Sequence, residues 1–163
     1  MNNADTLTTL YSHNLWANIK LFECCANLSD EQLDSTIIGT FGTIRDTLQH
    51  IVGAEQSYFA RISTGLPRRR IEGAPAPTMA EMLESLRTTG AGFVEWAPKV
   101  QAGDLVDVKW ENDETKHISK AIILTQVINH ATEHRSQIMA ILTQLGVQPP
   151  DLDGWTYFEE NEK

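Results

Sequence analysis

Two histidines, His130 and His134, stand four residues apart in a segment whose other regularly spaced residues are apolar. On a helical wheel they share a stripe with Ile123, Val127 and Ile141, so their rings lie on one face, one turn apart. Two imidazoles at this spacing can bind one metal ion, as in the helical zinc motifs. Because buried polar groups need partners, the alternative is a pair of neutral core histidines hydrogen-bonded to other groups.

A third metal ligand has to come from elsewhere in the chain, and the remaining histidines are His13, His50 and His117. His117 lies in a polar stretch that favours exposure. His50 lies on the flank of an apolar helical face, with Asp46 one turn before it. The pattern therefore favours His50 as the third ligand, with Asp46 placed to accept its second ring N–H. The alternative is a boundary histidine that pairs with Asp46.

Three histidines leave a fourth coordination position open, which is typical of a catalytic site where a metal lowers the pKa of a bound water or thiol. The run from His130 to His134 also spells the His-x-x-Glu-His motif of inverzincin proteases. We do not predict a protease, because only tail carboxylates follow as further ligands and Glu133 points about 100° away from His134 on a helix. Glu133 and Gln137 remain candidates for orienting a ligand, and Glu133 for acting as a base.

Four helical segments must position these side chains, since each has apolar residues at three- and four-residue spacing. They are predicted over about 5–27, 43–65, 78–97 and 119–145. Thr43 and Thr78 are suitable N-caps, and a capping box at Ser29 predicts a short turn of helix between the first two segments. Gly90 and Gly92 lower the helix propensity of the third segment.

Two further segments complete the expected fold. Residues 103–116 predict a short strand or an ordered loop, and the tail over 151–163 is expected to pack on the helices through Trp155, Tyr157 and Phe158. We predict an all-α domain over residues 1–163, a four-helix bundle. Its connections of about 12–20 residues allow long crossovers.

The composition excludes several classes of protein. The chain has 163 residues, of which 41% are hydrophobic and 21% charged, with a net charge of −9. The only basic cluster, Arg68-Arg69-Arg70, is typical of a solvated loop, so we predict no nucleic-acid partner. No apolar run is long enough to span a membrane and no signal peptide is visible, so a cytoplasmic protein is expected. The adjacent Cys24 and Cys25 cannot form a disulfide framework and are expected to serve packing.

Four segments together resemble the DinB/YfiT-like family of metalloenzymes, and the resemblance covers nearly the whole chain. In chain order these are Tyr11-Ser-His-Asn-Leu-Trp16-Ala-Asn18, Thr43-Ile-Arg-Asp-Thr-Leu-Gln-His50-Ile, His130-Ala-Thr-Glu-His134-Arg135-Ser-Gln137-Ile and Leu145-Gly-Val-Gln-Pro149-Pro150-Asp151-Leu-Asp153. The resemblance implies a helical bundle with crossover topology and a metal site formed by His50, His130 and His134. It also implies nickel or zinc as the metal, and a homodimer.

Related members of that family include enzymes that use low-molecular-weight thiols. The resemblance therefore favours a metal-dependent transferase that activates a thiol, or a hydrolase that activates water. Two alternatives remain open at this point. In the first alternative the chain is a non-catalytic metal-binding stress-response module. In the second it is a structural helical dimer whose histidines are core groups.

Overall fold

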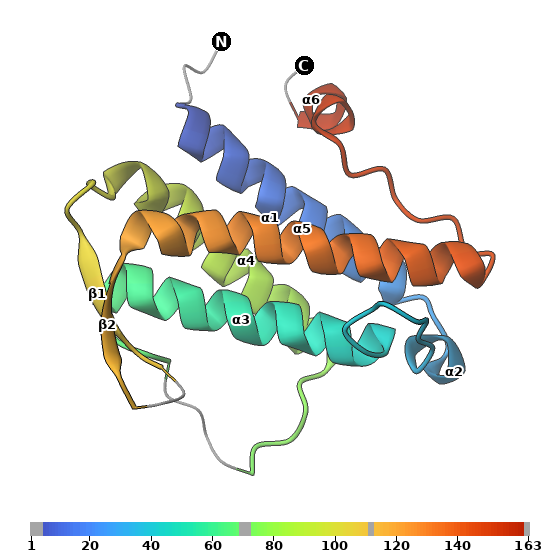
Figure 1. Ribbon diagram of the computed structural model, residues 1–163. Coiled ribbons are helices and arrows are strands. Elements are labelled where there is room, and N and C mark those ends of the chain that lie inside the picture. The colour runs from blue at the N-terminus through green and yellow to red at the C-terminus, as the bar shows by residue number, and fades with distance from the viewer. Residues whose placement is uncertain (1–4, 69–72, 111–112, 162–163) are drawn as a thin grey trace.

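A computed structural model of the chain describes residues 5–68, 73–110 and 113–161 (Figure 1). It is mostly helical. The helices are α1 (Thr6–Cys25), α2 (Asp30–Leu33), α3 (Ile44–Thr64), α4 (Met79–Trp96), a 3-10 turn η1 (Ala97–Lys99), α5 (Lys120–Gln144) and α6 (Gly154–Asn161). The prediction of an all-α chain is wrong in one respect, because two strands, β1 (Leu105–Lys109) and β2 (Thr115–Ser119), form a small antiparallel sheet.

The helices begin at the residues that their capping patterns predict. The hydroxyl of Thr43 accepts a hydrogen bond from the backbone N–H of Asp46 at the start of α3. Ser29 and Thr78 each form a complete capping box, so α2 and α4 begin immediately after them. Local side-chain chemistry therefore fixes where these helices start.

The four long helices pack against one another, and each of α1 and α3 contacts both α4 and α5 (Figure 1). Of these pairs only α3 and α4 are consecutive along the chain, whereas α1 packs on α4 and α5, and α5 packs on α3. Their apolar faces form two clusters. One lies toward α2: Leu21, Phe22, Cys25, Ile44, Leu48, Ile51, Val52, Met82, Leu86, Ile138, Ile141 and Leu142. The other includes β1: Tyr11, Ile62, Phe93, Ala97, Val106, Ile123, Leu124 and Val127.

The segments outside the long helices close the ends of this core. β1 and β2 pair in register from Leu105 opposite Ser119 to Lys109 opposite Thr115, and β2 leads directly into α5. The tail packs on α1, where the ring of Tyr157 makes an edge contact with Trp16. The prediction that all three tail aromatics pack on the helices is wrong for Trp155 (79% exposed) and Phe158 (52% exposed).

Both cysteines are free thiols, as expected from their adjacent positions. Cys25 is fully buried, and burial raises the pKa of its thiol to about 12. Its role is therefore packing. Within the described part of the chain, no helix has the length and apolar character needed to cross a bilayer.

The two glycines of α4 lie directly against side chains of neighbouring helices. A Cβ atom added at Gly90 would lie 2.5 Å from Cδ1 and 3.0 Å from Cβ of Leu15 on α1, and one added at Gly92 would overlap the ring of Phe59 on α3. The low helix propensity of glycine is thus the cost of a close approach between α4 and both of its neighbours.

This packing predicts opposite effects for two matched substitutions. Gly90→Ala should lower the free energy of unfolding by about 1–3 kcal/mol, because overpacking outweighs the gain in helix propensity. Gly53→Ala, in the middle of α3, should raise it by up to about 1 kcal/mol, because nothing lies within 4 Å of the added Cβ. Urea unfolding of both variants measures the difference. Equal stabilisation by the two alanines would contradict the close approach at Gly90.

Candidate metal centre

The structure brings together the three histidines that the sequence singles out. His50 from α3 and His130 and His134 from α5 each offer one ring nitrogen, and these nitrogens all lie within 4.8 Å of one another. The Nε2 atoms of His50 and His130 are 2.9 Å apart. His134 is only 5% exposed, and the other two rings are half-buried. Two helices therefore present three imidazoles to one point.

The chemistry of this donor set fits a divalent metal ion. Metal–nitrogen bonds of about 2.1 Å place two ligands of a tetrahedral site about 3.4 Å apart, a value between the 2.9 Å and 4.8 Å observed here. A ligating imidazole must be neutral. Burial lowers the pKa of His130 to about 4 and also lowers the pKa of His50. The neighbouring histidines of the cluster add to both shifts. Both shifts favour the uncharged form of the ring, which is the form that binds a metal.

Gln137 determines which nitrogen of His134 faces the cluster. Its Oε1 accepts a hydrogen bond of 3.1 Å from the backbone N–H of Phe41, which identifies that atom as the oxygen. The same oxygen lies 2.9 Å from Nδ1 of His134, so Nδ1 carries the proton and donates. In the neutral ring Nε2 is then left with a free lone pair. Gln137 is therefore in a position to orient the ring of His134, one of the three clustered histidines.

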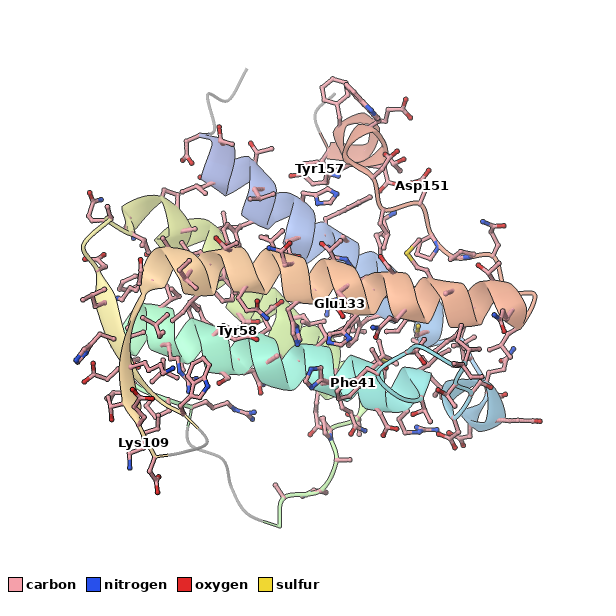
Figure 2. The ribbon with its side chains drawn as sticks, in the orientation of Figure 1. Phe41, Tyr58, Lys109, Glu133, Asp151 and Tyr157 are labelled. Atoms are coloured by element: carbon pink, nitrogen blue, oxygen red, sulfur yellow. The ribbon has the colours of Figure 1, made fainter. Side chains whose placement is uncertain are left out.

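The loop before α3 places an aromatic ring over this cluster. The hydroxyls of Thr36 and Thr40 both donate to the carbonyl of Gly42, which folds the loop back on itself. The ring of Phe41 then stacks on His50 with centroids 4.1 Å apart, while Tyr58 of α3 contacts the edge of His130. Figure 2 labels both residues, Phe41 on the loop before α3 and Tyr58 on α3 itself. Carbon-rich rings thus cover part of the cluster.

The remaining residues considered from the sequence lie elsewhere. Glu133 is exposed on α5, and within the described residues no hydrogen bond or ion pair joins it to the histidines. Asp46 is exposed too, and no hydrogen bond to His50 is recorded among the described residues, so the expected pairing of these two is not observed. His117 in β2 contacts Asp107, and His13 contacts the backbone carbonyl of Leu152.

A buried polar network lies directly behind the histidines. The guanidinium of Arg135, which follows His134 on α5, donates to Oδ1 of Asn14 (2.7 Å) and Oδ1 of Asn18 (2.6 Å) on α1. The amide of Asn18 donates in turn to Oε2 of Glu55 on α3 (2.9 Å). The hydroxyl of Thr89 on α4 donates to Oε1 of Glu55. Every long helix therefore contributes a member.

Sequence reasoning assigned no role to this network. Its members lie between the two apolar clusters along each helix, and Arg135 and Glu55 are only 5% and 4% exposed. One available signal is the spacing of Asn14 and Asn18, which places two amides four residues apart on a helix. The partners on the other helices are distant in sequence, and only the fold brings them together.

Burial sets the protonation behaviour of the network. It raises the pKa of Glu55 to about 7, although hydrogen bonds from Thr89 and Asn18 and the charge of Arg135 oppose this shift. Burial also lowers the pKa of Arg135 to about 10, which leaves the guanidinium charged at neutral pH. The folded protein therefore holds a proton on Glu55 at pH values where an unfolded chain has released it.

Comparisons with known proteins agree with this architecture. The chain matches the DinB family over residues 1–163. It is 24% identical to the protein DinB of Bacillus subtilis (strain 168), over 98% of this chain and 99% of that protein. A crystal structure of a DinB-like protein from Bacillus subtilis superposes with a TM-score of 0.63 at 12% identity, covering 88% of this chain and 97% of that one. A DinB-like protein from Bacillus cereus gives 0.60 at 18% identity, covering 86% and 91%.

The raised pKa of Glu55 predicts how stability depends on pH. Between about pH 4.5 and 7 the unfolded state binds fewer protons at this group than the folded state, so the free energy of unfolding falls as pH rises. Glu55→Gln removes this contribution, so its stability relative to the parent should increase from pH 5 to pH 8. Urea unfolding at both values measures it. Glu23→Gln, on the exposed face of α1, is the control, and a pH-independent difference for Glu55→Gln would contradict the prediction.

The contact between Gln137 and His134 predicts a loss of metal affinity on substitution. Gln137→Ala should weaken binding of zinc by about 10–100-fold, because the ring of His134 loses the acceptor that fixes its orientation. Competition with a chromophoric chelator measures the affinity. Gln144→Ala, exposed at the end of α5, should leave it unchanged. Equal affinities for the parent and Gln137→Ala would show that this hydrogen bond does not support metal binding.

Proposed function

Because the chain belongs to the DinB family and gathers three histidines at one point, we propose that it is a divalent-metal-dependent enzyme. The observation that carries the proposal is the convergence of ring nitrogens from His50, His130 and His134 on two different helices. Nickel or zinc is the proposed metal. When bound there, it would act as a Lewis acid that favours the deprotonated form of a thiol or a water.

The surrounding residues support a binding site more than a merely structural contact. Gln137 holds His134 in the tautomer whose free lone pair faces the cluster. The rings of Phe41 and Tyr58 pack against His50 and His130 and keep water from part of the cluster. Within the described residues the cluster has three members, which leaves room for a ligand that the protein does not supply.

The proposed reaction is a transfer to or from a low-molecular-weight thiol, similar to that of a thiol S-transferase, with hydrolysis as the variant in which water takes the place of the thiol. The proposal includes a cytoplasmic, homodimeric protein with the topology of a four-helix bundle with long crossover connections. It includes no nucleic-acid partner, in keeping with the net charge of −9.

A non-catalytic metal-binding module is the second candidate. One observation favours it: the carboxylate nearest in sequence to the cluster, Glu133, is exposed and makes no recorded contact with the histidines among the described residues. A protein without a positioned base can still hold a metal in a stress response. Metal binding alone therefore does not separate the two candidates, whereas turnover does.

Substitution of the histidines tests both candidates. His50→Ala and His134→Ala should each reduce bound zinc or nickel well below the stoichiometry of the parent, measured by elemental analysis after dialysis. The metal-loaded parent should react a panel of thiols with electrophiles, and both variants should lose that turnover. His117→Ala, an exposed position of β2, is the matched control and should retain both properties.

The outcomes distinguish the candidates. Full metal content in both variants would exclude the proposed site. Metal that is lost with the histidines, without any turnover by the loaded parent, would favour the non-catalytic module.

A further inference from the structure

A cavity of about 320 Å³ lies against the candidate metal centre. Its wall is formed by one face of α3 and by the first residues after it: Gln49, His50, Gly53, Ala54, Ser57 and Arg68. His50 belongs both to this wall and to the histidine cluster. A small molecule that fills the cavity therefore contacts the ring of one proposed ligand, and its volume lies within the usual range for a small-molecule site.

Three polar side chains of this wall, those of Arg68, Ser57 and Gln49, can donate hydrogen bonds. Arg68 carries a positive charge, and among the described residues it has no ion pair. Ser57 accepts a hydrogen bond from the guanidinium of Arg61 at its Oγ, which leaves its own hydroxyl proton available to donate. The amide of Gln49 has no recorded partner within the described residues and offers two more N–H groups.

Among the described residues that line this wall none is acidic, although the chain has 22 acidic against 13 basic residues. A second cavity of about 490 Å³ shares Gln49, Gly53 and Arg68 and does include one carboxylate, that of Glu81. That carboxylate accepts hydrogen bonds from the backbone N–H and the hydroxyl of Thr78 in the capping box of α4. It is therefore held by the start of the helix.

We propose that the cavity beside His50 binds an anionic group of the reacting molecule, a carboxylate or a phosphate, through Arg68. The inference rests on the proposed function, because it places this anion beside the ligand His50. The planar guanidinium offers a pair of N–H donors that match two oxygens of such a group, and Gln49 and Ser57 supply donors on the α3 side. The substrate class is thus a small anionic molecule, and for the proposed transfer a thiol that carries a carboxylate.

The test uses the full-length, metal-free protein and follows backbone amide signals by NMR. The probes are 3-mercaptopropionate, its neutral analogue 3-mercapto-1-propanol, and inorganic phosphate. We expect 3-mercaptopropionate to shift the amides of Gly53, Ala54 and Ser57 and to bind more tightly than the neutral thiol. Arg68→Gln should weaken its binding about tenfold, and Arg68→Lys should restore part of it.

The control variant is Arg87→Gln, an exposed arginine of α4 that pairs with Glu23 and lies outside this cavity. It should leave the affinity unchanged. Tighter binding of phosphate than of 3-mercaptopropionate, with the same dependence on Arg68, would assign a phosphate-bearing ligand, and the reverse order a carboxylate. Equal affinities for the parent and Arg68→Gln, or no saturable shift in the parent, would overturn the inference.

Failure of this inference is separable from failure of the proposed function. Arg68 is exposed and lies outside the histidine cluster, so Arg68→Gln should keep the metal stoichiometry of the parent. If the histidine variants lose metal while Arg68→Gln binds the probes as the parent does, only the anion site is wrong. If the histidine variants keep their metal, the proposed metal site is wrong whatever the probes do.

Discussion

The buried charge of Arg135 is the constraint on which the rest of the structure depends. A guanidinium that is 5% exposed destabilises the fold unless acceptors surround it, because the hydration it loses must be replaced. Its acceptors come from Asn14 and Asn18 on α1, and Asn18 links it to Glu55 on α3. A shift of α1 by one turn along α5 would remove these acceptors from Arg135. The same shift would only replace one apolar contact by another. The polar network thus specifies the register of the helices, while the apolar clusters on either side supply most of the stabilisation.

This constraint also positions the candidate site. His134 and Arg135 are consecutive on α5, so their side chains leave the helix about 100° apart. When Arg135 is directed toward α1, His134 is directed toward α3, where His50 lies. The network and the histidine cluster therefore lie on two different faces of the same turn of α5. A rigid interior behind the histidines limits how far their rings can move, which is what a preorganised binding site requires.

Local signals predicted much of the fold, and non-local contacts account for the rest. Capping residues such as Thr43 and Thr78 fixed helix starts because their hydrogen bonds span only three residues. The pair His130 and His134 was visible because helical spacing brings them together. The structure places His50 beside them, but sequence reasoning missed Phe41, which reaches the cluster from a loop. Gly90 was interpreted as a weakness of α4 because its close neighbour, Leu15, lies 75 residues earlier in the chain.

Overall charge and local charge have to be considered separately in this protein. A net charge of −9 describes the solvated outside of the molecule, where salt screens charges beyond about 8–10 Å. The chemistry beside His50 is set by the groups that line the cavity, and these are the imidazole of His50, an amide, a hydroxyl and the cation of Arg68. An acidic protein can thus present a donor-lined cavity that attracts anions, provided that its own carboxylates are held elsewhere. Glu55 is held in the interior by Asn18 and Thr89, and Glu81 by its capping box, and among the described residues neither forms an ion pair with Arg68.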